Sequence, residues 1–285
     1  MPHFILSAFG DEIAPDLQQQ MKVLKKQEIS YIEIRGVNGR GIVEYSLRAV
    51  ENIKRQLDKN NFKISAVGSP LGKIDITDDF TPHFNLFKHT LKIADILETE
   101  YIRMFSFFIP EGEEPDKYRS QVITRWEEFL KEASGKGITL LHENEKDIYG
   151  DTPERCLDLL DTLKCDYFKA IFDPANFVQC DVDTYPEAFQ ILEEYIEYLH
   201  IKDALYSNYR VVPAGRGDGN LLDILQALAD KDFEGFLSLE PHLGSFAGLA
   251  DLERDSAVED LQESNKDKFS LAANALKKLL GKIEY

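Results

Sequence analysis

The feature that most constrains the fold of this 285-residue chain is a regular alternation of short apolar runs with longer amphipathic stretches. Each apolar run is rich in β-branched or aromatic residues, as is typical of buried strands in a parallel sheet. The sequence predicts eight such strands, at Phe4–Phe9, Tyr31–Ile34, Lys63–Val67, Tyr101–Phe108, Ile138–His142, Phe168–Phe172, Ile196–Ile201 and Phe236–Leu239.

The stretches between these runs carry apolar residues at helical spacing. In the first of them, Leu17, Met21 and Leu24 share one face of a helix. Pro153 follows Thr152 as a proline in the first turn follows an N-cap residue. The expected helices are Asp16–Gln27, Leu47–Leu57, Phe84–Leu97, Tyr118–Ala133, Pro153–Leu163, one starting at Pro186 to Phe189, Leu221–Leu228 and Phe269–Leu280.

Strict alternation of strands and helices predicts an α/β protein with a parallel sheet and right-handed crossovers. Eight such units in a chain of this length match a (β/α)8 TIM barrel. An open, doubly wound sheet is the alternative. The barrel is favoured because no glycine-rich dinucleotide turn follows the first strand. No linker divides the chain, so a single domain over residues 1–285 is expected, with a long acidic loop at Gly244–Lys268.

The charge balance excludes one large class of function. The chain has 51 acidic and 33 basic residues, a net charge of -18, which repels a phosphate backbone and argues against a nucleic-acid-binding protein. The three cysteines fit no zinc spacing and are expected to be reduced thiols of a cytoplasmic protein. We find neither a signal peptide nor an apolar stretch long enough to span a bilayer, so no membrane partner is expected.

Polar residues end four consecutive predicted strands. They are Glu143, Asp173, His200 and Glu240. The carboxyl ends of barrel strands face the active site, and alternation along each strand is consistent with all four side chains converging there. Three carboxylates and an imidazole would suit one divalent ion such as Mn²⁺, Zn²⁺, Co²⁺ or Mg²⁺. The alternative is that each is a separate surface or capping residue, although a charge that ends a buried strand is costly without a partner or a metal.

The runs that contain these residues carry a resemblance to a known family. They are His-Glu-Asn-Glu at 142–145, Phe-Asp-Pro-Ala-Asn at 172–176, His-Ile-Lys-Asp at 200–203 and Glu-Pro-His at 240–242. In this order and spacing they resemble the sugar phosphate isomerase/epimerase family, whose xylose isomerase-like TIM barrels are related to D-tagatose 3-epimerase, inosose dehydratase and endonuclease IV. The resemblance covers essentially the whole chain.

The resemblance implies roles for individual residues. Glu143, Asp173, His200 and Glu240 would be the metal ligands, and the two glutamates would also act as acid and base on opposite faces of a sugar. The chain departs from ketose 3-epimerases at Asn176, where some of them have a substrate-contacting histidine. Their arginine after the metal histidine has no counterpart at the same offset, although Arg210 and Arg216 follow in the same loop.

The implied chemistry is proton transfer next to a carbonyl group. A bound metal would stabilise an enediolate while a carboxylate removes a proton and a second group returns one. Lys202 is placed to bind a substrate oxygen or to serve as a base, so Glu143, Glu240 and Lys202 are the expected catalytic residues. Loss of water from the same intermediate would give an inosose-type dehydratase instead.

Other strand ends supply further candidates for substrate binding. Glu33 and Arg35 share one face of the second strand, and Arg35 could reach a carboxylate or phosphate. The remaining candidates are Glu12, Ser106, Glu145, Asn176 and Arg210. The glycine-rich loop at 215–219 could cradle a phosphate or could be a turn that needs positive φ angles.

The leading function is therefore a metal-dependent sugar, sugar phosphate or polyol isomerase or epimerase. An inosose-type dehydratase is the first alternative. An endonuclease IV-like enzyme would need more histidines than the six present, and a non-catalytic sugar-binding barrel would not need two opposed glutamates. The expected partner is a small sugar or polyol, and the resemblance implies a homodimer or homotetramer.

Overall fold

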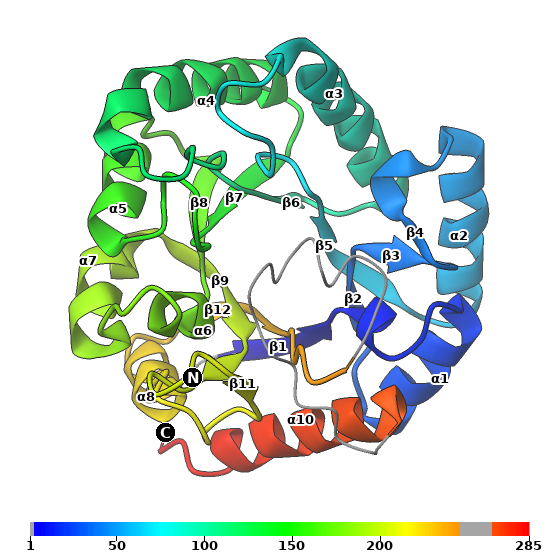
Figure 1. Cartoon of the computed structure of the whole chain (residues 1–285). Helices are drawn as coiled ribbons and strands as arrows, with labels where there is room; N and C mark the ends of the chain where they lie inside the picture. Colours follow the sequence, from blue (N-terminus) through cyan, green and yellow to red (C-terminus); the bar gives the residue numbers. More distant parts are fainter. Residues whose placement is uncertain (1–2, 245–263, 285) are drawn as a thin grey trace.

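The computed structural model describes residues 3–244 and 264–284, and eight parallel strands form its central sheet. In chain order they are β1 (His3–Ala8), β2 (Tyr31–Ile34), β5 (Lys63–Gly68), β6 (Tyr101–Met104), β7 (Thr139–Glu143), β8 (Phe168–Phe172), β9 (Ile196–Ile201) and β12 (Glu234–Leu239). Neighbours pair in parallel around the ring, and β1 pairs with β12. A single parallel bridge between Phe9 and Glu33 joins β1 to β2, so the sheet is a nearly closed TIM barrel (Figure 1).

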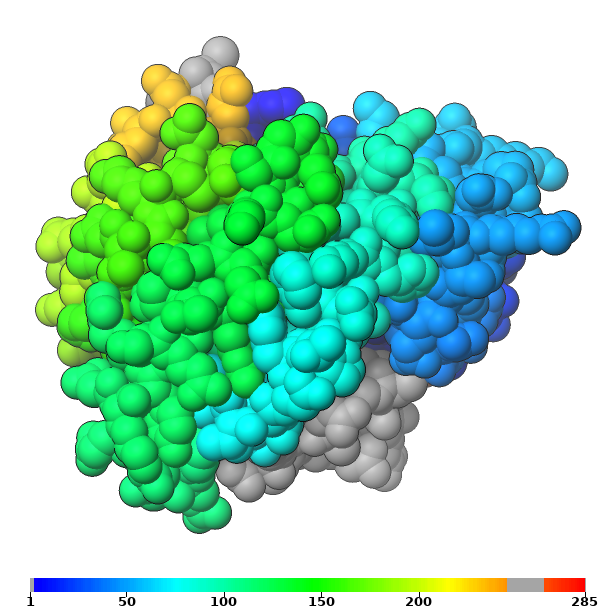
Figure 2. All heavy atoms as spheres, turned by 90° about the horizontal axis from the view of Figure 1, so that it is seen from above, coloured from blue at the N-terminus to red at the C-terminus, as the bar shows by residue number. Residues whose placement is uncertain are grey.

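Helices surround the barrel on its outside (Figure 1). They are α1 (Leu17–Lys26), α2 (Leu47–Lys59), α3 (Phe80–Leu97), α4 (Arg119–Ala133), α5 (Pro153–Thr162), α6 (Pro174–Val178), α7 (Phe189–Leu192), α8 (Leu221–Asp230) and α10 (Asn265–Leu280). Figure 2 is turned so that α3 and α4 face the viewer, where they lie side by side along the outer wall. No helix in the described parts of the chain is long and apolar enough to cross a membrane.

Side-chain caps set several helix starts. Asp16 accepts a hydrogen bond from the Gln19 amide at the start of α1, and Thr152 accepts one from Arg155 at the start of α5. Asp79 caps α3, which therefore begins at Phe80 and not at Phe84 as the sequence predicts. Ser264 likewise starts α10 at Asn265, four residues before the expected Phe269.

Other elements depart further from the sequence prediction. Strand β6 ends at Met104 instead of Phe108, because the Phe105 amide leaves the sheet and donates to the Leu71 carbonyl. The short helix α6 was not expected, and Pro174 is its first residue. The helix expected from Pro186 is only the single turn of α7, after an irregular turn at Thr184–Ala188. Of the long loop expected at Gly244–Lys268, residues 245–263 lie outside the described residues.

Two small hairpins extend from the carboxyl ends of strands. They are β3 (Gly36–Val37) with β4 (Arg40–Gly41), and β10 (Asp203–Ala204) with β11 (Val211–Val212). The Asp203 carboxylate accepts hydrogen bonds from the amides of Gly215, Gly217 and Gly219 at 2.8–3.0 Å. The glycine-rich loop is therefore folded around a carboxylate of its own chain, and its amides are not open to a phosphate.

The described residues form four apolar clusters, of which two bear on the barrel. The larger of these two lies between the sheet and the helices and includes the fully buried Trp126 and Phe129 of α4. The smaller lies inside the barrel, where Leu141, Ile171 and Tyr198 pack together. The barrel interior also buries polar and charged side chains, whereas apolar layers usually fill such barrels.

Candidate metal centre

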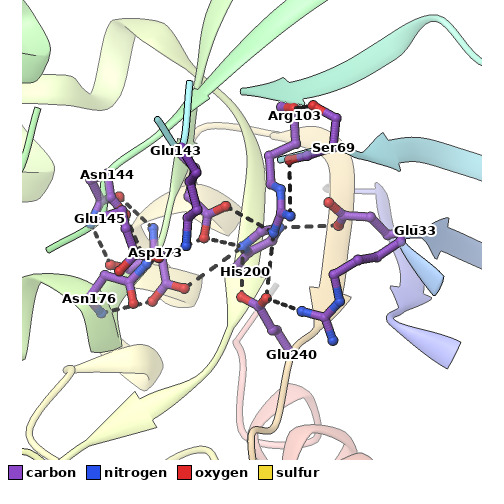
Figure 3. A network of polar contacts seen from close by, with 12 residues as sticks. Glu33, Ser69, Arg103, Glu143, Asn144, Glu145, Asp173, Asn176, His200 and Glu240 are labelled. Atoms are coloured by element: carbon purple, nitrogen blue, oxygen red, sulfur yellow. Dashed lines mark hydrogen bonds and ion pairs between the residues drawn. The ribbon is translucent and has the colours of Figure 1, made fainter. Parts of the chain in front are cut away.

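Four potential ligands from four neighbouring strands meet inside the carboxyl end of the barrel (Figure 3). Glu143 is the last residue of β7, Asp173 follows β8, His200 lies on β9 and Glu240 follows β12. Each side chain offers one donor atom, and these atoms lie within 4.8 Å of one another. None of the four residues is more than 2% exposed.

The histidine lies at the centre of this group. Its Nδ1 atom is 3.0 Å from Glu143 Oε1, 3.2 Å from Glu240 Oε2 and 3.8 Å from Asp173 Oδ2. Its other ring nitrogen, Nε2, is 3.1 Å from Glu33 Oε2. Burial alone would lower the pKa of His200, but Glu143, Glu33 and Glu240 together raise it well above its usual value. In the absence of a metal, the imidazole is therefore held as a cation among carboxylates.

Local hydrogen bonds orient Asp173. Its Oδ1 atom accepts the Asn176 amide at the start of α6, as an N-cap residue does. The side chain of Asn144 accepts the Asp173 amide and donates to the Asp173 carbonyl, both at 2.9 Å. These contacts fix the backbone and one carboxylate oxygen, and they leave Oδ2 facing the cluster (Figure 3).

The donor set fits a divalent cation. Glu143 Oε2, Asp173 Oδ2 and Glu240 Oε2 are buried and have no hydrogen-bond partner among the described residues, although cationic groups lie near each of them. Buried carboxylate oxygens without hydrogen bonds are costly, and a metal ion would satisfy them. Three oxygens and one imidazole nitrogen are ligands that Mn²⁺, Zn²⁺, Co²⁺ and related ions accept.

Three cationic side chains surround these carboxylates. Arg103 lies 3.2 Å from Glu143 Oε2 and 3.6 Å from Glu240 Oε1, and Arg35 lies 3.1 Å from the same Glu240 oxygen. Lys202 Nζ is 3.1 Å from Asp173 Oδ2 and 3.6 Å from Glu240 Oε2.

These cations decide the ionisation of the two glutamates. Burial would raise the pKa of Glu143, but His200 and Arg103 lower it to about 2. Burial acts in the same direction on Glu240, and Lys202, His242 and His200 hold its pKa well below the usual value. Both glutamates are therefore ionised over the physiological pH range.

A second group of charges adjoins Glu240. Arg35 pairs with Asp11 at 2.8 Å and with Glu12 at 3.4 Å. Glu12 also accepts the His242 amide at 2.8 Å, and the His242 ring is 3.3 Å from Glu240 Oε1. Glu12, Glu240 and His242 could themselves hold an ion, but Arg35 already places a positive charge between Glu12 and Glu240.

The remaining candidates from the sequence differ in their distance from the centre. Asn176 Nδ2 donates to Glu143 Oε1 at 3.3 Å, so it belongs to the group. Glu145 is buried nearby and pairs with Lys73 at 2.7 Å. Arg210 directly precedes β11 (Val211–Val212), in the loop that joins β10 to β11.

Ser106 also lies apart from the four ligands. Its hydroxyl contacts the His142 ring at 2.9 Å and accepts the Gly150 amide at 2.8 Å. His142 in turn packs against Trp126 of α4, on the helix side of the sheet. The Ser106 hydroxyl is therefore engaged by neighbours of its own chain, and its role as a substrate contact stays a prediction.

The sequence prediction missed several members of the site. Arg103 lies within an apolar run, and its place two residues after Tyr101 on the inner face of β6 was a usable signal. The pairing of Glu33 with His200 was missed because it joins residues 167 positions apart. His242 was expected inside only if the strand continued past Pro241, whereas a left-handed backbone at φ 44° turns it toward Glu12.

Comparisons with known proteins agree with this architecture. The sequence has no match among curated proteins, but residues 21–265 match the family model described as xylose isomerase-like TIM barrel. Among solved structures, the probable 3-DHS dehydratase AsbF from Bacillus anthracis has a TM-score of 0.73 at 17% identity, covering 97% of this chain and 99% of its own. The IOLI protein with a binding zinc atom has a TM-score of 0.75 at 15% identity, covering 99% of both chains. D-psicose 3-epimerase from Clostridium cellulolyticum H10, solved with D-tagatose, has a TM-score of 0.74 at 15% identity, covering 99% and 100%. The chain belongs to the xylose isomerase-like TIM barrel family.

Proposed function

We propose that this protein is a divalent-metal-dependent isomerase or epimerase of a small sugar, sugar phosphate or polyol. One observation carries the proposal. Two ionised glutamates, Glu143 and Glu240, lie 3.0 and 3.2 Å from the same nitrogen of His200, and Asp173 completes a set of four donors. Structural neighbours described as a D-psicose 3-epimerase and as a protein with a zinc atom support the same conclusion.

Glu143, Asp173, His200 and Glu240 would hold the metal. When bound there, a divalent cation polarises a carbonyl oxygen as a Lewis acid and makes the neighbouring C–H bond more acidic. The carboxylate of Glu143 or Glu240 would remove the proton from that carbon. Because both glutamates rest as carboxylates, the proton returned to the opposite face would come from the Lys202 ammonium group, and transfer of the first proton from the glutamate to Lys202 would restore the site. Because the two glutamates come from β7 and β12, they approach a substrate from different sides, which is what epimerisation requires.

The surrounding residues prepare these groups for their roles. Arg103 and Arg35 each pair with one oxygen of a glutamate, Glu143 and Glu240 respectively. His200 and Arg103 keep Glu143 ionised, and Lys202, His242 and His200 keep Glu240 ionised, as a ligand and a base must be. Lys202, buried beside Asp173 and Glu240, can donate a hydrogen bond to a substrate oxygen. Glu12, Glu145 and Asn176 are proposed to contact substrate hydroxyl groups. Arg210 remains a candidate contact from the hairpin loop.

A dehydratase is the second candidate, because Lys202 could also protonate a departing hydroxyl group. A solved neighbour described as a probable 3-DHS dehydratase supports this alternative. The two functions separate by product, since an epimerase returns an isomer of equal mass whereas a dehydratase releases one water.

The first test is metal binding by the full chain. We would load purified protein with Mn²⁺ or Zn²⁺, desalt it and measure metal by elemental analysis, with Asp173→Asn and His200→Gln alongside. The matched control is His142→Gln, which replaces another fully buried histidine that lies outside the donor set. We expect about one ion per chain in the wild type and the control, and loss of the ion in the two ligand variants.

The same samples would then be screened for exchange of substrate carbon-bound hydrogen with D₂O, using ketoses and inososes. We expect exchange only in the metal-loaded wild type and control. A wild type without metal, or metal retained in both ligand variants, would contradict the proposal.

A further inference from the structure

A chain of hydrogen bonds runs through the barrel interior and ends on the candidate metal ligand. Ser7 and Ser65 are 2.6 Å apart at their hydroxyl oxygens, and Ser65 is 2.9 Å from the Tyr198 hydroxyl. Tyr198 donates to Glu33 Oε2 at 2.9 Å, and the same oxygen lies 3.1 Å from His200 Nε2. We call Ser7, Ser65, Tyr198 and Glu33 the interior chain; they come from β1, β5, β9 and β2.

The donors in this chain can be assigned by counting protons. A carboxylate only accepts, so the Tyr198 proton goes to Glu33 and the Ser65 proton goes to Tyr198. Ser7 then donates to Ser65. Glu33 Oε2 also accepts from His200 Nε2, which places a ring proton on Nε2. The other nitrogen, Nδ1, is the one that faces Glu143 and Glu240 and would bind the metal.

The surroundings make these bonds hard to replace. Ser7, Glu33, Tyr198 and His200 are 0% exposed and Ser65 is 1% exposed. Around the Tyr198 ring pack Leu141 and Ile171, with Phe236 beside them. If one hydrogen bond of the interior chain is removed, its partner becomes a buried polar group that no water can reach. Each hydrogen bond therefore constrains the orientation of the next residue in the chain.

We infer that Tyr198, held by Ser65 and Ser7, is a positioning residue for the metal centre: it fixes Glu33, and Glu33 fixes the ring orientation and the Nε2–H tautomer of His200. The inference rests on the proposed four-residue metal site. It extends that site across the barrel interior, from His200 on β9 to Ser7 on β1. The physical reason is that a ligand histidine binds a metal well only when its other ring nitrogen has a fixed hydrogen-bond partner.

The decisive variant is Tyr198→Phe, which keeps the packed ring and removes only the hydroxyl. Its matched control is Tyr101→Phe, which removes a hydroxyl from a neighbouring interior tyrosine whose ring centre is 6.2 Å from that of Tyr198. The Tyr101 hydroxyl donates to Glu197 at 2.6 Å and is not part of the interior chain. Both variants have the same change in composition, but Tyr198 is fully buried and Tyr101 partly buried, so urea unfolding of both variants is measured alongside.

We would measure Zn²⁺ affinity of the full-length proteins by competition with a chromophoric chelator. Glu33→Gln is expected to lose about 10–100-fold in affinity and Tyr198→Phe about 10-fold, while Tyr101→Phe stays within about 2-fold of the wild type. The ¹⁵N shifts of the His200 ring in the zinc-loaded protein give a second readout. They should show a proton fixed on Nε2 in the wild type and in Tyr101→Phe, and a changed Nε2 signal in Tyr198→Phe.

The outcomes separate this inference from the proposed function. A wild type that binds no zinc overturns both. A wild type that binds zinc, with Tyr198→Phe equal to it or with Tyr101→Phe equally weakened, overturns the positioning role alone. If Tyr198→Phe does not fold, Ser65→Ala carries the test, since it breaks the next link and is expected to weaken zinc binding several-fold without changing the tyrosine.

Discussion

Two buried histidines of this protein have pKa values that are shifted in opposite directions. His142 and His200 are 1% and 0% exposed and lie near the carboxyl ends of β7 and β9. His142 points outward against Trp126, and burial lowers its pKa to about 3. His200 points into the barrel, where burial would also lower its pKa, but Glu143, Glu33 and Glu240 raise it well above its usual value.

The same contrast holds for the regions around them. The aromatic layer consists of His83, Phe107, Trp126, Phe129 and His142 between the sheet and helices α3 and α4. In this layer burial is the main influence on ionisation, and together with the nearby Arg125 guanidinium it lowers the pKa of His83 to about 4. The charged cluster is the group of four ligands with Arg35, Arg103 and Lys202. In the charged cluster, the charges of neighbouring groups shift the pKa values of Glu143, His200 and Glu240 more than desolvation does. Shifts caused by specific charged partners, and not burial by itself, are typical of a functional site.

The largest difference is expected when an arginine is removed from each region. Arg103→Met removes the buried guanidinium that lies 3.2 Å from Glu143 and 3.6 Å from Glu240, and should cost about 3 kcal/mol of unfolding free energy although His200 remains beside both carboxylates. Arg125→Met in the aromatic layer removes stacking on Phe80 and Phe107 and one hydrogen bond to a backbone carbonyl, and should cost about 1–2 kcal/mol.

Urea unfolding of both variants with a chelator present would measure this difference, because a bound metal would mask the missing cation. Zinc should then recover part of the stability of Arg103→Met and none of that of Arg125→Met. Equal losses in the two variants would mean that the charged cluster is no more dependent on its cations than the aromatic layer is.

A further effect is expected from pH, with opposite signs for the two histidines of the aromatic layer and for Glu12 and His242 beside the charged cluster. His83 and His142 have lowered pKa values, so the unfolded chain binds more protons and stability falls as the pH drops from 6.5 through about 4 and about 3. For His83 this amounts to about 3 kcal/mol. In the second group of charges, which adjoins the charged cluster, burial raises the pKa of Glu12 to about 7. His242, despite burial and Lys202, is raised to about 9 by Glu240 and Glu12.

For this second pair, the folded chain holds protons that the unfolded chain releases, so stability falls as the pH rises from 4.5 to 7 and from 6.5 to 9. The metal-free protein should therefore be most stable near neutral pH. Denaturation at a series of pH values would show two limbs. His83→Gln, whose amide can still accept the Gly72 N–H, should flatten only the acid limb, and His242→Gln only the alkaline one. If His83→Gln altered the alkaline limb, or His242→Gln the acid limb, the assignment of the two limbs to these two histidines would be wrong.

Much of the fold was predictable because it depends on local periodicity. The strands β2, β8 and β9 begin and end at the predicted residues, since each is a short apolar run between polar turns. The end of β6 was not predictable, because Phe105 and Phe107 continue the apolar pattern while their amides bond to the loop after β5. Tertiary hydrogen bonds, and not local sequence, end that strand.

The candidate site was predictable to the extent that it follows strand alternation. Glu143, Asp173, His200 and Glu240 were singled out because strand ends meet at one end of a barrel, and the structure brings them together. Arg103 was missed because the local sequence does not identify the distant carboxylates with which it pairs, although strand alternation places it on the inner face of β6. Ser106 lies two residues after the end of β6, and its hydroxyl contacts the His142 ring, so its role as a substrate contact stays a prediction.

The smallest predicted effect tests this role of Ser106. Ser106→Ala removes the hydroxyl that contacts the His142 ring and accepts the Gly150 amide, and should cost about 1 kcal/mol of unfolding free energy. Because both contacts belong to the aromatic layer, zinc content and substrate KM should remain those of the wild type. Urea unfolding and steady-state kinetics on one preparation measure both quantities. An increase in KM at unchanged stability would instead show that Ser106 contacts the substrate and does not belong to the aromatic layer.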